Sequence, residues 1–114
     1  MRRIYIASAY GRRHGKSEEE CEQNTIRAIE VGRQLIMRGF NPLIPHLWHY
    51  IAKGWRHDIK DEDLWYSLVS EWVQCCDALF VADYPSWENS GVQAEIELAE
   101  SLGKPVYWSL EAIK

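Results

Sequence analysis

The chain has 114 residues, of which 46% are hydrophobic and 26% are charged, and its formal net charge is −4. These values are typical of a soluble globular protein large enough to bury its own core, so we expect one domain over residues 1–114. A weakly acidic chain lacks an overall basic surface, which argues against general binding to nucleic-acid polymers or membrane surfaces.

The cysteines and the N-terminal composition indicate a cellular compartment. The three cysteines are Cys21, Cys75 and Cys76, an odd number in which two are adjacent. This pattern is typical of reduced intracellular thiols rather than of disulfides. No apolar run near the N-terminus has the length of a signal peptide or a membrane span, so we expect a cytoplasmic protein.

The first predicted elements are a strand and a long helix. Arg3–Ala7 is a short β-type run, and the polar, basic segment Ser8–Lys16 follows it. Ser17 and Glu20 have the spacing of a capping box, which predicts a helix that ends before Gly39. The expected buried stripe of this helix comprises Cys21, Thr25, Ala28, Ile29, Gly32, Leu35 and Ile36.

The remaining elements continue an alternation of strands and helices. After Gly39 we expect a strand at Phe40–Ile44 and then an aromatic-rich loop with about one helical turn at His46–His57. A helix at Ile59–Cys76 follows, with Leu64, Leu68, Trp72 and Cys76 on one face. The last expected elements are a strand at Ala78–Ala82, a loop at Asp83–Asn89, a helix at Ser90–Leu102 and a strand at Pro105–Trp108. This alternation predicts an open parallel sheet with helices on both faces.

One carboxylate does not fit the amphipathic pattern of the last helix. Val92, Ile96, Ala99 and Leu102 share one face, and Glu95 lies inside that apolar arc. Glu97, Glu100 and Lys104 fall outside it, as solvated charges do. A carboxylate on an apolar face is costly unless it is paired or used. Glu95 is therefore part of a buried ion pair, a side chain that snorkels to solvent, or a nucleophile or general base in a cleft.

The loops that follow the strands are where ligands bind in open parallel sheets. The loop after the first strand contains Ser8, Gly11, Arg12 and Arg13 and precedes a long helix, which predicts that it binds an anion. The alternative is that this loop is a solvated basic surface without a ligand. Asn89, Ser90 and Gly91 open the last helix, where Ser90 serves as N-cap, as phosphate ligand, or as both.

Histidines and aromatic residues raise two further hypotheses. His46, His49 and His57 match no usual zinc spacing, so we expect no metal and assign His46 a single hydrogen-bonding role. The chain has six tryptophans and six tyrosines. Most of them are expected in the core, and some are expected to line a pocket for a flat ligand.

Several short motifs resemble those of the nucleoside 2-deoxyribosyltransferase superfamily, which includes 2′-deoxynucleoside 5′-phosphate N-hydrolases. The resemblance covers nearly the whole chain, and its most specific part is the G-V-x-x-E-x-x-x-A element from Gly91 to Ala99. The motifs that carry it are Tyr5-Ile6-Ala7-Ser8, Cys76-Asp77-Ala78-Leu79, Ser90-Gly91-Val92-Gln93-Ala94-Glu95, Gly103-Lys104-Pro105, and Trp87, Ser90 and Glu95 as an approximation of W-x-x-S-x-G-x-x-x-E.

The resemblance implies a fold, an activity and a set of site residues. The implied fold is a three-layer α/β domain, flavodoxin-like or Rossmann-like, with a four- or five-stranded parallel sheet. The implied activity is cleavage or transfer of the N-glycosidic bond of a nucleotide or nucleoside, without a cofactor, with Glu95 attacking C1′ of the sugar. The implied substrate-binding residues are Tyr5, Ser8, Gly11, Arg12, Arg13, His46, Asn89, Ser90 and Gly91.

Two further expectations concern turnover and assembly. Val69 occupies the position of the superfamily's second acid, so a non-catalytic nucleotide-binding regulatory protein that uses the same cleft is the alternative function.

The helix at Ile59–Cys76 carries apolar residues at Trp65, Val69, Trp72 and Val73, which we interpret as covering more than one side of the helix. Together with the resemblance, this pattern predicts a homodimer or a higher homo-oligomer.

Overall fold

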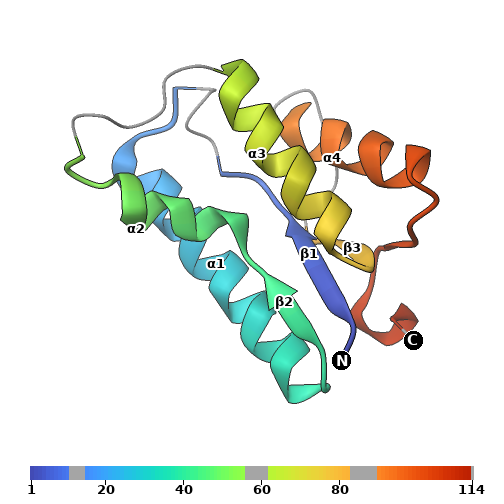
Figure 1. The fold of residues 1–114 in the computed structure, drawn as a ribbon. Helices are drawn as coiled ribbons and strands as arrows, with labels where there is room; N and C mark the ends of the chain where they lie inside the picture. The colour runs from blue at the N-terminus through green and yellow to red at the C-terminus, as the bar shows by residue number, and fades with distance from the viewer. Residues whose placement is uncertain (11–14, 56–61, 83–89, 114) are drawn as a thin grey trace.

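The fold was taken from a computed structural model of the whole chain, which describes residues 1–10, 15–55, 62–82 and 90–113. Its centre is a four-stranded sheet in which every neighbouring pair of strands is parallel, in the order β2-β1-β3-β4 (Figure 1). The strands are β1 (Arg3–Ala7), β2 (Asn41–Leu43), β3 (Ala78–Val81) and β4 (Val106–Tyr107). The predicted parallel α/β sheet is therefore confirmed, and each strand lies within its expected range.

Helices cover both faces of this sheet (Figure 1). They are α1 (Glu18–Met37), α2 (Trp48–Ala52), α3 (Glu62–Cys75) and α4 (Ser90–Ser101), with 3₁₀ turns η2 (Pro45–Leu47) and η4 (Leu110–Ala112). This arrangement is that of a three-layer, flavodoxin-like fold. Among the helices that the structure describes, none combines the length and the apolar content needed to cross a bilayer.

Alternate residues of the central strands supply the two halves of the core. Ile4 and Ile6 of β1 and Phe80 of β3 face α1, where they pack with Leu35. The residues facing α3 and α4 form a second cluster, which comprises Tyr5, Ala7, Leu79 and Val81 from the strands and Val69, Val73, Cys76, Val92, Ile96 and Ala99 from the helices and their ends. A central parallel strand is thus apolar at consecutive positions because both of its faces are covered.

Helix α1 begins and ends as its sequence predicts. The Glu20 amide donates to Ser17 Oγ over 3.1 Å, and the Ser17 amide donates to Glu20 Oε1 over 3.1 Å, which together form the capping box. Gly39 follows the helix with φ of 88°, a conformation that favours glycine. The expected stripe is wrong at Ile36, which is 59% exposed, because this position lies beyond the arc that faces the sheet.

The buried face of α3 differs from the expected one. Val69 and Val73 are buried, and Trp65 and Trp72 pack against the same cluster, so all four face one core. These positions repeat with the spacing of a single helical stripe. The expectation of apolar residues on more than one side was therefore wrong. The expected face of α3 is wrong at Leu64, which is 48% exposed, and is confirmed at Trp72 and Cys76, which pack in the core. A homo-oligomer remains a prediction, without this argument to support it.

The segment after β2 is more ordered than expected. In place of a loop with one turn, η2 begins at Pro45 and continues directly into α2. Proline is favoured at the first position of a helix because its missing amide is not needed there. Near the C-terminal end, α4 stops at Ser101, one residue before the expected Leu102. The Leu102 side chain is 43% exposed, so it does not belong to the buried face of this helix.

Candidate functional site

The candidate site lies where the strand order reverses, between β1 and β3. Strands β1 and β3 are neighbours in the sheet. The helix that follows β1, α1, and the helix that follows β3, α4, cover opposite faces of the sheet (Figure 1). Ala7 and Val81 are register partners, so the two strands end side by side. Ligands of open α/β folds bind in the crevice outside this point, so a ligand is expected at the carboxyl ends of β1 and β3.

Glu95 and Tyr5 are hydrogen-bonded beside this reversal point. Tyr5 lies on β1 with its side chain toward α3 and α4, and it is 1% exposed. Helix α4 carries Glu95 between the buried residues Val92 and Ile96, and the Tyr5 hydroxyl donates to its carboxylate. The sequence pattern that placed Glu95 within the apolar arc of its helix therefore corresponds to a carboxyl group facing the protein interior.

Desolvation dominates the acidity of this pair. Burial of the carboxyl group raises the pKa of Glu95 to about 8, against a smaller lowering effect of the hydrogen bond from Tyr5. Burial, the nearby Glu95 charge and the hydrogen bond together hold the pKa of Tyr5 well above its usual value. Glu95 as a whole keeps a fraction of its surface exposed, so its carboxyl group is surrounded by protein without being sealed off. The predicted rise of the Glu95 pKa is confirmed, and the cleft in front of it remains a prediction.

His46 joins the loop after β1 to the segment after β2. Its Nε2 donates to the carbonyl oxygen of Ser8 over 2.9 Å, and the ring is 5% exposed. This contact confirms a hydrogen-bonding role for His46. It also uses the backbone of Ser8, so two of the predicted substrate-binding residues hold each other in place at the carboxyl ends of β1 and β2.

A tyrosine–histidine pair that the sequence did not reveal lies next to this contact. The Tyr10 hydroxyl and His49 Nδ1 are 2.7 Å apart, and His49 is 4% exposed. Asn24 of α1 fixes the backbone here by donating from Nδ2 to the Tyr10 carbonyl oxygen over 2.9 Å. The available signal was the i, i+3 spacing of His46 and His49, which places both rings on one side of the helical segment, where they contact Ser8 and Tyr10.

Four tryptophans form a continuous array that links α2 to α3. The ring centroids are 6.3 Å apart for Trp48 and Trp55, 5.8 Å for Trp48 and Trp65, and 5.7 Å for Trp65 and Trp72. These separations are within the range of favourable aromatic contacts. The array is intramolecular, so Trp65 contacts Trp48 of its own chain.

The structure describes some of the other predicted site residues and leaves the rest outside the described ranges. Gly91 is partly buried in the first turn of α4, and Ser90 is the first residue of that helix. Val69, at the position where the resemblance expects an acid, is 6% exposed within the apolar core. The predicted residues Gly11, Arg12, Arg13 and Asn89 lie outside the described residues.

The Cys76-Asp77-Ala78-Leu79 motif has a structural role at the opposite end of the sheet. Asp77 Oδ2 accepts the Arg3 amide over 2.8 Å, and the Arg3 guanidinium lies 3.4 Å from Oδ1. Hydrogen bonds from the Arg3 backbone and side chain lower the pKa of Asp77. All three cysteines are free, and burial raises the pKa of the Cys76 thiol to about 11. This motif thus joins the amino ends of β1 and β3, away from Glu95.

No group of three or more metal-ligating side chains occurs within residues 1–10, 15–55, 62–82 and 90–113. The two histidines nearest the site use one ring nitrogen each for protein contacts, His46 with Ser8 and His49 with Tyr10. The described residues therefore offer hydrogen-bond donors and one buried carboxyl group to a ligand.

Comparison with known proteins identifies the family. A family model described as a domain of unknown function, DUF1937, matches residues 2–110. The chain belongs to the DUF1937 family. No curated protein matches this DUF1937 chain. The match spans β1 through β4 and so includes both Tyr5 and Glu95.

Proposed function

We propose that this protein cleaves or transfers the N-glycosidic bond of a nucleotide or nucleoside, deoxy or ribo, with Glu95 as the nucleophile. The observation that carries the proposal is the desolvated Glu95 carboxyl group, hydrogen-bonded to Tyr5 beside the carboxyl ends of β1 and β3. A carboxylate in such a place stabilises a developing oxocarbenium ion and can bond to it. The resemblance to the nucleoside 2-deoxyribosyltransferase superfamily, which assigns the same residue, supports the proposal.

The proposed chemistry has two balanced steps. In the first, a Glu95 carboxylate oxygen forms a bond to C1′ of the sugar, and the C1′–N bond breaks with its electron pair leaving on the base. The base takes up a proton from solvent as it leaves. In the second step, water or an acceptor base attacks C1′, gives up a proton, and releases the Glu95 carboxylate. Tyr5 acts as a positioning residue, because its hydroxyl donates to the carboxylate throughout.

The acidity of Glu95 sets the pH range of this reaction. With a pKa of about 8, most of the carboxyl group is protonated at neutral pH, and only the ionised form attacks C1′. Turnover therefore rises with pH and levels off above about 8. The same protonation favours the alternative function, binding of a nucleotide without turnover, since a neutral carboxyl group is a hydrogen-bond donor rather than a nucleophile.

We propose a phosphorylated substrate on the basis of the loops around the site. Ser8 directly follows β1, Arg12 and Arg13 come next in the sequence, and Ser90–Gly91 begin α4, the helix after β3. Arginine side chains and the free amides of a helix N-terminus are the usual ligands of phosphate. Nucleoside 5′-monophosphates are then expected to bind more tightly than their nucleosides, and salt is expected to weaken this preference.

A substrate panel tests the function. Nucleosides and 5′-monophosphates with each common base, as ribosides and deoxyribosides, are incubated with the protein, and free base is measured by chromatography. Intact-protein mass spectrometry in parallel detects a sugar or sugar phosphate bound to the protein. The proposal expects release of one or more bases and a rate that falls by orders of magnitude in Glu95→Gln.

The controls separate the two functions. Glu97→Gln changes an exposed carboxylate on the same helix and is expected to keep the wild-type rate. Equal rates in wild type and Glu95→Gln would refute the role of Glu95. Saturable nucleotide binding, with neither base release nor a mass adduct at pH 9, would establish the non-catalytic alternative.

A further inference from the structure

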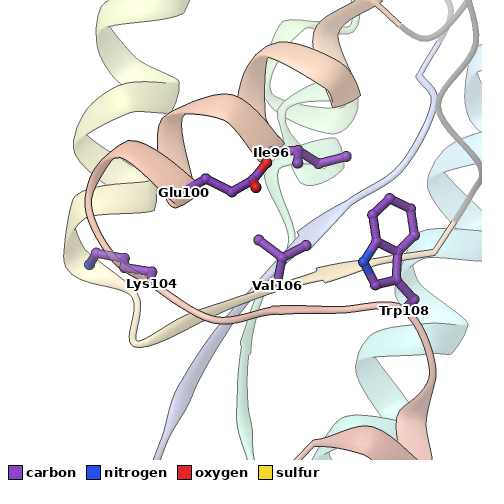
Figure 2. Close-up of a pocket in the computed structure, with 5 residues that line it drawn as sticks. All are labelled: Ile96, Glu100, Lys104, Val106 and Trp108. Carbon is purple, nitrogen blue, oxygen red and sulfur yellow. The ribbon is translucent and has the colours of Figure 1, made fainter.

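A second concave site lies on the side of α4 that faces β4. It is an open cavity of about 420 Å³ lined by Ile96, Glu100, Lys104, Val106 and Trp108. Figure 2 shows α4 above it and β4 below, with Ile96 extending sideways from the helix, Val106 pointing up from the strand, and the Trp108 ring at one end. The volume is within the range of pockets that take small organic ligands.

The walls of this cavity combine an apolar floor with one aromatic face. Ile96 is 4% exposed and Val106 is partly buried, and these two side chains form the apolar floor. Trp108 is 53% exposed and lines the cavity directly after the end of β4. An indole face beside aliphatic side chains favours a flat ligand, and its π-electrons attract a cation.

The charge that faces this cavity is negative. The Lys104 ammonium group is turned away, because Nζ donates to the carbonyl oxygen of Gln74 over 2.6 Å and also to that of Cys76. Figure 2 shows the Glu100 side chain running along α4 toward Ile96, over the cavity. Within the described part of the chain, no side chain forms an ion pair with the Glu100 carboxylate.

We propose that this cavity binds a flat organic cation, such as an amidinium, a guanidinium or a protonated amino-heterocycle. The cation lies on the Trp108 ring with its charged end toward Glu100 and its apolar part against Ile96 and Val106. The site is independent of the function proposed for Glu95, which lies on the same helix but is directed toward Tyr5 on β1. A ligand here contacts α4 and β4 without entering the space beside Glu95.

Benzamidine is a suitable probe, and benzamide is its neutral counterpart of the same shape. In a titration of ¹⁵N-labelled protein followed by NMR, we expect saturable shifts of the Trp108 indole N–H and of backbone amides in residues 96–108. Benzamidine is expected to bind at least about threefold more tightly than benzamide, and 0.5 M salt to remove most of this difference.

Matched variants localise the charge. Glu100→Gln is expected to weaken benzamidine by about threefold and to leave benzamide unchanged, whereas Glu97→Gln on the same helix has no effect on either probe. Trp108→Leu is expected to weaken benzamidine by about fivefold. Because Glu100 is exposed, its variant folds and remains informative even if Trp108→Leu does not. Equal affinity for benzamidine and benzamide, or an unchanged affinity in Glu100→Gln, would overturn the proposal.

Discussion

The Tyr5 hydroxyl on the central strand β1 donates a hydrogen bond to the Glu95 carboxylate on α4. This contact joins two groups that prefer to be neutral in the apolar interior, since burial raises the pKa of both. The first two predictions depend on the resulting pKa of Glu95, and neither needs a known substrate.

The free energy of unfolding is expected to fall as the pH rises from about 5 to about 8. Glutamate in an unfolded chain ionises near pH 4.3, whereas Glu95 in the folded protein holds its proton up to about 8. Between these values the folded state binds more protons than the unfolded state, so this contribution to stability is present at low pH and is lost as the pH rises through 8. The maximum slope is about 1.4 kcal/mol per pH unit.

Urea denaturation from pH 4 to pH 9 measures this effect. Glu95→Gln carries no ionisable group at this position, so its free energy of unfolding is expected to exceed that of the wild type by a few kcal/mol above pH 8 and to approach it near pH 4. Glu97→Gln, on the exposed side of α4, serves as the control and is expected to follow the wild type. A difference between wild type and Glu95→Gln that does not depend on pH would contradict the pKa of about 8.

Tyr5→Phe is expected to raise the pKa of Glu95 further. The phenylalanine ring keeps the packing against Val73 and Leu79 but removes the hydroxyl that donates to the carboxylate. Loss of a hydrogen bond to a charged group corresponds to a shift of about one pKa unit. Carboxyl ¹³C NMR of glutamate-labelled protein measures this pKa directly. An unchanged Glu95 resonance would show that the hydrogen bond contributes nothing to its acidity.

Trp65 is expected to be the most important member of the tryptophan array for stability. It contacts Trp48 on one side and Trp72 on the other, and it packs against the core that contains Tyr5. Trp65→Leu is expected to lower the free energy of unfolding by about 2 kcal/mol in urea denaturation, and to reduce the near-ultraviolet circular dichroism. Trp55→Leu removes the terminal ring of the array, which is 44% exposed, and is expected to cost less than half as much.

Lys104 is expected to stabilise the end of α3. Its Nζ donates to the carbonyl oxygens of Gln74 and Cys76, where the helix leaves carbonyl groups without partners of its own. Lys104→Met keeps the length of the side chain and is expected to lower the free energy of unfolding by about 1–2 kcal/mol. Lys16→Met, at an exposed lysine 4.0 Å from Glu20, is expected to change it by less than 0.5 kcal/mol, a typical value for a surface ion pair. Equal effects of the two changes in thermal or urea unfolding would contradict a capping role for Lys104.

Local sequence rules predicted the elements that depend on local interactions. The strand at Arg3–Ala7, the capping box of α1 and the glycine that ends it are each determined by residues within a few positions of one another. The odd position of Glu95 was also visible, because a helical projection compares near neighbours. These features required no knowledge of which segments meet in three dimensions.

The features that the sequence did not reveal depend on tertiary contacts. Tyr10 and His49 meet because β1 and β2 are neighbours in the sheet, and no local pattern pairs them. Lys104 was expected in solvent, and it instead reaches the end of a helix that lies far away in sequence. On α3 the expected face included Leu64 and omitted Trp65, because both positions are apolar and only packing against the core distinguishes them.

The Arg3–Asp77 contact has a consequence for how the chain acquires its structure. The two residues that join the amino ends of β1 and β3 are 74 positions apart, and β1 pairs with β3 from Ile4 to Ala7. During synthesis, β1 therefore emerges before β3, and one of its edges stays unpaired until β3 is complete. Long-range pairing of this kind slows folding, because the entropy of closing the long loop between the two strands is lost before the strands gain their contacts. Fragments that end before Asp77 are thus expected to remain unfolded and to associate through β1, and ribosome-bound chains acquire protease resistance only after β3 has left the exit tunnel.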